Sequence, residues 1–187
     1  MKYLIIGLGN IGEEYENTRH NIGFTVLDAL AQDRSVTFSS DRYGAVANFH
    51  FKGRQFVMVK PSTYMNLSGK AVRYWMQKEN VEAANILVVT DDIDLDLGTI
   101  RLRASGSGGS HNGLNHIIET LGNNEFPRLR FGIGKDYPRG MQVDYVLGKW
   151  SRSEEAIILK RIPIAVEAVI SFAAQGVART MNDFNKR

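Results

Sequence analysis

The chain has 187 residues, of which 43% are hydrophobic and 23% charged, as in an ordinary globular domain large enough to bury a core. Lysine and arginine (23 together) slightly outnumber aspartate and glutamate (20), and the net charge of +3 suits an anionic partner such as nucleic acid without requiring one. The lack of cysteine excludes disulfides, thiolate metal ligands and a thiol nucleophile. No apolar run approaches the roughly 18 residues of a membrane span, and the first one stops at Gly7, too early for a signal peptide. We therefore expect one cytoplasmic domain over residues 1–187, without membrane contact.

Strand-like and helix-like patterns alternate along the chain. In order they are strand 2–7, helix 21–32, strands 44–51 and 55–60, helix 67–78, strands 85–90 and 99–104, helix 114–122, and strands 128–134 and 143–147. A hairpin turn at 52–54 joins two of the strands. A long helix begins near Ser151, which forms a capping box with Glu154; Pro163 should kink or interrupt it and Gly176 should end it. This order predicts an α/β domain with a mixed, mostly parallel sheet flanked by helices.

The first strand runs into Gly7, Gly9 and Gly12, which have the spacing of a dinucleotide-binding fingerprint. In such a site the third glycine opens a helix whose N-terminus meets the pyrophosphate. Here Gly12 is followed by acidic residues without apolar periodicity, and we expect the helix only after Thr18. The next strand candidate, residues 36–40, ends without a carboxylate for the ribose. The context therefore argues against a dinucleotide site.

Polar side chains follow several predicted strands, where sites gather in open α/β sheets. Asn10 and His20 come after the first strand, Asp91 lies just past a buried strand, and Asn112 lies at a loop-to-helix junction. A histidine, a carboxylate and carboxamides meeting there would suit a hydrolase that activates water. The serine- and glycine-rich stretch 105–110 is, by itself, a surface loop.

Five stretches carry a resemblance to a known family. "GLGNIGEEYENTRHNIGF", "KPSTYMNLSG", "DDIDLDLG", "SHNGL" and "RLRFGIG" resemble the bacterial peptidyl-tRNA hydrolases, in the same order and at similar spacing. The resemblance implies a monomeric esterase with a mixed sheet wrapped by helices, needing no metal and no other cofactor. It further implies cleavage of the ester between a peptide and the terminal ribose of tRNA, with contacts to the acceptor stem and the 3′ end.

The resemblance also implies roles for the matching residues. His20 matches the general base, Asp91 the carboxylate that orients it, and Asn10 the asparagine that separates N-blocked from free aminoacyl-tRNA. Substrate and tRNA contacts are implied for Tyr15 and Tyr64 (3′ end), Asn66 and Asn112 (peptide and terminal nucleotide), and Arg103 and Arg130 (phosphates). His111, beside Asn112, receives no role.

Plainer interpretations of these residues stay open. His20 suits a helix cap or the surface, and Asn66 and Asn112 suit helix caps. Each of the arginines on the two strands, Arg101, Arg103, Arg128 and Arg130, suits solvated surface. The four aspartates between 91 and 96 would also suit magnesium.

Three positions depart from the family pattern. Ile11 replaces a proline, Ser110 a glycine, and Asn115 a lysine. The runner-up function is a non-catalytic RNA-binding relative of the same fold, of the kind found among plastid splicing factors. A serine hydrolase is disfavoured because the chain has no Gly-x-Ser-x-Gly.

Overall fold

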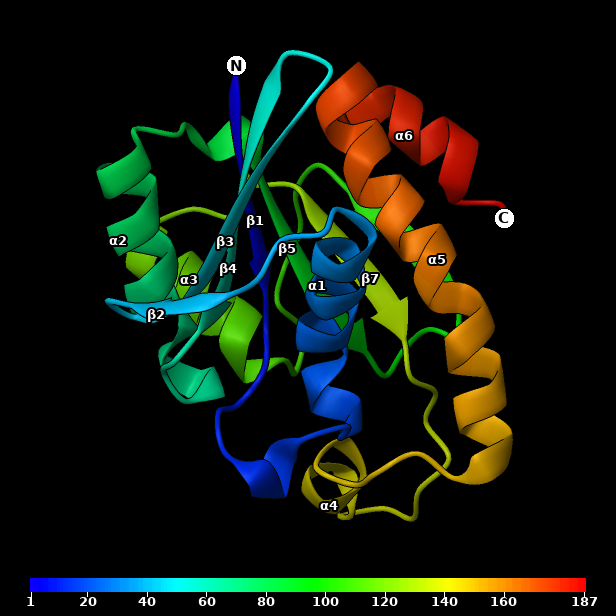
Figure 1. Ribbon diagram of the computed structural model, residues 1–187. Coiled ribbons are helices and arrows are strands. Elements are labelled where there is room, and N and C mark those ends of the chain that lie inside the picture. The colour runs from blue at the N-terminus through cyan, green and yellow to red at the C-terminus, as the bar shows by residue number, and fades with distance from the viewer.

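The computed structural model describes all residues, 1–187, and is built around one seven-stranded sheet (Figure 1). The strands are β1 (Lys2–Gly7), β2 (Ser39–Asp41), β3 (Gly44–Phe51), β4 (Arg54–Pro61), β5 (Ile86–Asp92), β6 (Ile100–Arg103) and β7 (Arg128–Gly132). Their order across the sheet is β2-β3-β4-β1-β5-β7-β6. The central strands β4, β1, β5 and β7 are parallel neighbours, whereas β3 and β6 run antiparallel to them. The predicted mixed, mostly parallel sheet is confirmed.

Helices cover both faces of the sheet (Figure 1). They are α1 (Ile22–Asp33), α2 (Ser68–Glu79), α3 (Asn112–Leu121), α4 (Gln142–Val146), α5 (Arg152–Gln175) and α6 (Val177–Phe184). Short 3-10 turns, η1 (Glu13–Tyr15), η2 (Arg19–Asn21), η3 (Met65–Leu67) and η4 (Ala83–Asn85), lie in the connections. No helix combines the length and apolar character needed to cross a membrane.

The alternation of side chains along β1 shows how the sheet feeds two cores. Tyr3 and Ile5 join the core shared with α1, α5 and α6, whereas Leu4 and Ile6 join the core shared with α2 and α3. Successive side chains of a strand point to opposite faces, so a strand buried on both faces reads as a continuous apolar run. The central strands are therefore fixed from both sides, and their carboxyl ends form a rigid edge.

The glycines after β1 allow a helix to pack close to the backbone of the sheet. A Cβ atom at Gly7 would lie 2.5 Å from the carbonyl oxygen of Gly23, and one at Gly23 would lie 2.5 Å from the nitrogen of Leu8. Helix α1 begins at Ile22, after Thr18 as expected. The spacing that resembles a dinucleotide fingerprint thus serves contact between α1 and the end of β1.

The expected strand at 143–147 is wrong, because these residues fall in and just after helix α4. The apolar alternation of this segment was ambiguous between the two structures over so few residues. The hydroxyl of Tyr145 donates to the carbonyl oxygen of Ile133 at 2.6 Å, which holds the turn against the end of β7. The strand expected at 36–40 also differs, since β2 begins only at Ser39.

The long helix α5 begins and ends as predicted. Ser151 and Glu154 form the capping box, and Gly176 follows the helix with a φ of 87°. The expected interruption does not occur, since α5 continues through Pro163. Pro163 removes only one backbone hydrogen bond, and buried residues before and after it, such as Ile162 and Val166, hold both parts of the 24-residue helix against the core.

Candidate active site

The carboxyl ends of β1 and β5 bring the first predicted pair together. His20 lies in the 3-10 turn η2 before α1, and Asp91 lies near the end of β5. The Nδ1 atom of His20 is 2.7 Å from Oδ2 of Asp91. The carboxylate accepts a hydrogen bond from the N–H group at Nδ1. The proton of a neutral His20 is therefore on Nδ1, and Nε2 keeps its lone pair.

Asp91 is held by a second histidine, His111, which stands immediately before α3. The backbone nitrogen of Leu114 donates to Nδ1 of His111 at 3.2 Å, so the proton of a neutral His111 ring sits on Nε2. This Nε2 lies 2.8 Å from Oδ1 of Asp91 and 2.9 Å from the hydroxyl oxygen of Thr90. Each carboxylate oxygen of Asp91 thus accepts from a different imidazole, which fixes the carboxylate plane.

The electrostatics of this triad favour an ionised Asp91 beside a basic His20. Burial raises the pKa of Asp91, but the charges and hydrogen bonds of His20 and His111 outweigh it and hold the pKa well below its usual range. Burial lowers the pKa of His20, and the neighbouring Asp91 carboxylate reverses this, so that the pKa ends above 6.5. A base strengthened in this way can take a proton from water.

Asn10 is held by Asn21 and faces the residues that precede α2. Its backbone nitrogen donates to Oδ1 of Asn21 at 2.8 Å, and Nδ2 of Asn21 donates to the carbonyl oxygen of Asn10 at 2.9 Å. The Oδ1 atom of Asn10 accepts from the nitrogen of Met65 at 2.8 Å. No protein acceptor takes the Nδ2 protons of Asn10, and this nitrogen is not sealed from solvent.

Two hollows lie along this edge of the sheet. One, of about 200 Å³, is lined by His20, Asp91, Asn112 and Arg130, and by the α4 residues Gln142, Val143 and Val146. The other, of about 690 Å³, is lined by Asn10 and Asn21 and extends past Phe24 to Lys60. The smaller one contains the pair of His20 and Asp91, and the larger one lies beside Asn10.

Of the two predicted phosphate contacts, only Arg130 lies in the smaller hollow. Its guanidinium is 3.2 Å from Oδ2 of Asp92. Arg103 is exposed on the edge strand β6 and pairs in register with Arg128, which pairs with Val88. Val88 lies three residues before Asp91 on β5, which corresponds to roughly 10 Å along the strand. Arg103 is therefore outside the hollow.

The neighbouring cation Arg128 is not a surface charge. It is 1% exposed and donates to the carbonyl oxygens of Gly106, Asn124 and Phe126, at 2.8, 3.0 and 3.2 Å. Burial, followed by the charge of Arg130, lowers its pKa to about 10. The expectation that Arg128 adds to a solvated set of cations is wrong, because it holds the glycine-rich stretch 105–110 in place instead.

Three predicted contact residues lie near Asn10 but outside the lining of both hollows. Tyr64 is 61% exposed, and Asn66 is exposed in η3, on either side of the Met65 nitrogen that Asn10 holds. Tyr15 is half-buried in the loop after β1. The capping alternatives are wrong, since Leu67 precedes α2 without a side-chain cap and His111 caps α3. These positions leave Asn66 and Asn112 available for other partners.

Asp92 and Asp94, two of the three aspartates that follow Asp91, form ion pairs. Arg130 pairs with Asp92, and Nζ of Lys135 lies 2.7 Å from Oδ1 of Asp94. The strand ends at Asp92, so Asp94 and Asp96 lie beyond it. Potential ligand atoms of His20, Asp91 and His111 do lie within 4.8 Å of one another, but the short contacts join each ring nitrogen to the carboxylate as hydrogen bonds. The geometry is that of a hydrogen-bonded triad.

Two residues of the site lay beyond sequence reasoning. His111 was visible only as a neighbour of Asn112, and its contact with Asp91 crosses 20 positions. Asn21 sat within the "TRHN" stretch, where the helix start gave it a sufficient explanation. A histidine directly before a helix, facing a strand-end carboxylate, is the signal that would have found the first of them.

Comparison with known proteins identifies the family. The family model described as Peptidyl-tRNA hydrolase matches residues 4–187. The peptidyl-tRNA hydrolase of Phocaeicola vulgatus is 57% identical over 187 residues, the full length of both chains. The one from Chlorobium phaeovibrioides is 46% identical, over 98% of this chain and 97% of its own. The crystal structure of the Acinetobacter baumannii enzyme has a TM-score of 0.92 and 34% identity, over 98% of this chain and 94% of that one. With matches of this extent around a site of this geometry, the chain belongs to the peptidyl-tRNA hydrolase family.

Proposed function

We propose that this chain hydrolyses the ester bond that joins a peptide to the 3′-terminal ribose of tRNA. The observation that carries the proposal is the 2.7 Å contact between His20 and Asp91, in a hollow open to a substrate. Membership of the peptidyl-tRNA hydrolase family gives the substrate class.

In the proposed reaction, His20 acts as the general base. Its Nε2 takes a proton from a water molecule, whose oxygen adds to the ester carbonyl carbon. The bond to the ribose oxygen then breaks, and the imidazolium returns its proton to that oxygen, so that peptide acid and free tRNA leave. A well-placed base of this kind supplies about 10²–10⁴ in rate. Asp91 stabilises the imidazolium through the Nδ1 hydrogen bond.

Asn10 is proposed to recognise the blocked amine. Its free Nδ2 can donate to the carbonyl oxygen of the first amide of the peptide. A free aminoacyl-tRNA carries an ammonium there, which is itself only a donor. The mismatch leaves both groups unpaired and disfavours the free form.

The remaining contacts are proposed for the tRNA. Asn112, in the hollow with His20, and the exposed Asn66 would hydrogen-bond the peptide and the terminal nucleotide. Stacking of Tyr15 and Tyr64 on unpaired bases would contribute about 1–3 kcal/mol per base. Arg130 and Arg103 would meet phosphates of the 3′ end and the acceptor stem. We further propose that the protein acts as a monomer in the cytoplasm.

The test is hydrolysis of two matched substrates. Purified protein should release the amino acid from N-acetyl-aminoacyl-tRNA and leave free aminoacyl-tRNA intact beyond its spontaneous decay. Equal release from both would overturn the role of Asn10. Binding of tRNA with no release from either would favour the non-catalytic RNA-binding relative instead.

A further inference from the structure

The residue next to the proposed base, Arg19, makes contacts that the proposed reaction does not use. Its side chain is only 12% exposed. One terminal nitrogen donates to the carbonyl oxygen of Tyr145 at 3.0 Å, and the other donates to Oε1 of Glu154 at 2.8 Å. These partners lie 126 and 135 positions further along the chain.

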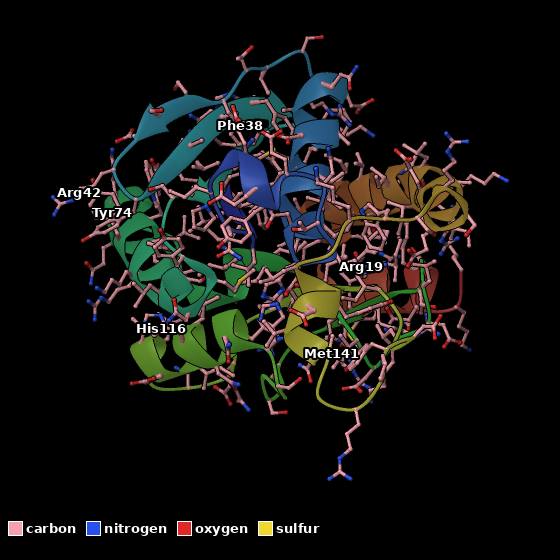
Figure 2. All side chains as sticks on the ribbon, turned by 90° about the horizontal axis from the view of Figure 1, so that it is seen from below. Arg19, Phe38, Arg42, Tyr74, His116 and Met141 are labelled. Carbon is pink, nitrogen blue, oxygen red and sulfur yellow. The ribbon has the colours of Figure 1, made fainter.

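Aromatic rings and a backbone pairing complete this attachment. The guanidinium carbon of Arg19 lies 4.2 Å from the ring centroid of Tyr145 and 5.5 Å from that of Trp150. The backbone nitrogen of Arg19 donates to the carbonyl oxygen of Gly148 at 3.0 Å, and Thr18 pairs with Lys149 as an isolated bridge. The turn that carries His20 is thereby joined to the segment between α4 and α5, and Figure 2 shows Arg19 beside α4.

The surroundings are arranged to admit the guanidinium. A Cβ atom at Gly148 would lie 2.7 Å from a terminal nitrogen of Arg19, so a larger residue there would displace the guanidinium from its present position. Glu154 receives Arg19 with the same oxygen that accepts from the nitrogen of Ser151 in the capping box. Burial raises the pKa of Glu154, but these hydrogen bonds and the charge of Arg19 lower it overall, so the carboxylate is ionised for the pairing.

Helix α4, which Arg19 contacts through Tyr145, forms one wall of the smaller hollow that contains His20. Gln142, Val143 and Val146 of α4 line the hollow together with His20. The hydroxyl of Tyr145 also ties α4 to the carbonyl oxygen of Ile133, just after β7. Arg19 therefore connects the base to a fixed element on the far side of the hollow.

We propose that Arg19 is a positioning residue for the hydrolysis: by joining η2 to α4 and to the start of α5, it holds His20 at hydrogen-bonding distance from Asp91. This inference rests on the proposed function. It concerns how His20 is placed, however, and so has a measurable consequence without substrate. A misplacement of 1 Å can lower a rate about 10²-fold.

The experiment compares Arg19→Ala and Arg19→Lys with a matched control, Arg34→Ala. Arg34 also stacks on an aromatic ring, 4.2 Å from Phe51, and pairs with Asp33 at 3.3 Å, but it follows the other end of α1. With N-acetyl-aminoacyl-tRNA, Arg19→Ala should lower kcat by tenfold or more and change KM by less than about threefold. Arg19→Lys should be intermediate, because an ammonium keeps the charge but loses the planar fork. Arg34→Ala should keep kcat within about twofold, although its Tm falls.

The proton on Nδ1 of His20 gives a second readout, by NMR of the free enzyme. Its hydrogen-bonded signal should be lost to exchange with water in Arg19→Ala and should persist in Arg34→Ala. If the wild type fails to cleave the blocked substrate, the proposed function fails while this readout still decides the placement of His20. An Arg19→Ala protein that retains the signal overturns the inference, whatever its kcat. The inference is also overturned if Arg34→Ala, at the same loss of Tm as Arg19→Ala, shows the same loss of kcat or of the NMR signal.

Discussion

Asp91 is the residue around which the site is organised. Its position follows from a buried strand, β5, that ends at the edge where β1 also ends. Its two oxygens accept from His20 and His111, which come from different loops. A carboxylate held on both sides keeps its orientation as the charge on His20 changes during a reaction.

Replacing Asp91 should alter both the rate and its pH dependence. Asp91→Asn is expected to lower kcat, but less than His20→Ala, because an amide oxygen can still accept from Nδ1 while the charge is gone. The carboxylate raises the pKa of His20, and the base works only when neutral, so wild-type kcat should fall as pH drops through a value above 6.5. In Asp91→Asn this acid limb should move to lower pH. Rate measurements across the pH range test this, and an unmoved limb would contradict the coupling.

The same raised pKa has a consequence for folding. Protonated His20 is stabilised by Asp91 in the folded state, so this contribution is fully present below about pH 6.5 and is lost as pH rises through the folded-state pKa. The site is thus most stably paired in the protonation state in which it is inactive.

Sequence reasoning reached His20, Asp91 and Asn10 through their motifs, and could not reach His111 in the same way. The contact between His111 and Asp91 depends on how the loop before α3 returns to β5, and no local periodicity encodes that path. The prediction that Arg128 is solvated was wrong for a related reason. The place of Arg128 in an alternating strand suggested solvent, whereas the carbonyl groups that accept from it belong to the loop after β6 and to the segment just before β7.

Among the elements, long periodic helices and buried strands were predicted correctly, while the shortest were not. Helix α1 differs from its prediction by one residue at each end, since an apolar face with helical periodicity specifies it. Helix α4 has only five residues, too few for the periods of helix and strand to separate. Its conformation is decided by the tertiary contacts of Tyr145 with Arg19 and Ile133.

The proline within α5 provides a test of that helix by itself. Pro163 removes one backbone hydrogen bond from a 24-residue helix, and it is exposed. Pro163→Ala should therefore raise the free energy of unfolding, by up to about 3 kcal/mol. Pro138→Ala, at an exposed position outside any helix, should be neutral or slightly destabilising. Urea denaturation of both variants measures this, and a less stable Pro163→Ala would mean that the packing of α5 requires the proline.

The two ends of the central parallel strands form two edges of the sheet with different features. The carboxyl edge holds the triad, both hollows and the proposed substrate contacts other than Arg103, which pairs with the first residue of β7. The amino edge holds the β3–β4 hairpin, whose turn has positive φ at Lys52 and Gly53. A net charge of +3 is small, so phosphate binding must depend on where the cations lie rather than on their number.

Salt dependence tests where the cations act. Neutralising Arg130 or Arg103 to glutamine should raise KM more than it lowers kcat, and each lost phosphate contact should flatten the slope of log affinity against log salt by roughly one unit. Arg54→Gln is the control, because Arg54 lies at the start of β4, on the amino edge, and donates to Lys52 and Ala174. If both test variants keep the wild-type slope, Arg130 and Arg103 make no phosphate contact and are ordinary solvated charges. A flattened slope in the control would mean that binding follows total charge alone.

The central claim is that His20, oriented by Asp91, activates the water that cleaves the ester. Single-turnover cleavage of N-acetyl-aminoacyl-tRNA by His20→Ala, with enzyme in excess, tests it most directly because product release is removed from the rate. The account predicts a rate lower by about 10² or more, with the fold and tRNA affinity of the wild type retained. Cleavage at a near-normal rate by a well-folded His20→Ala protein would contradict it.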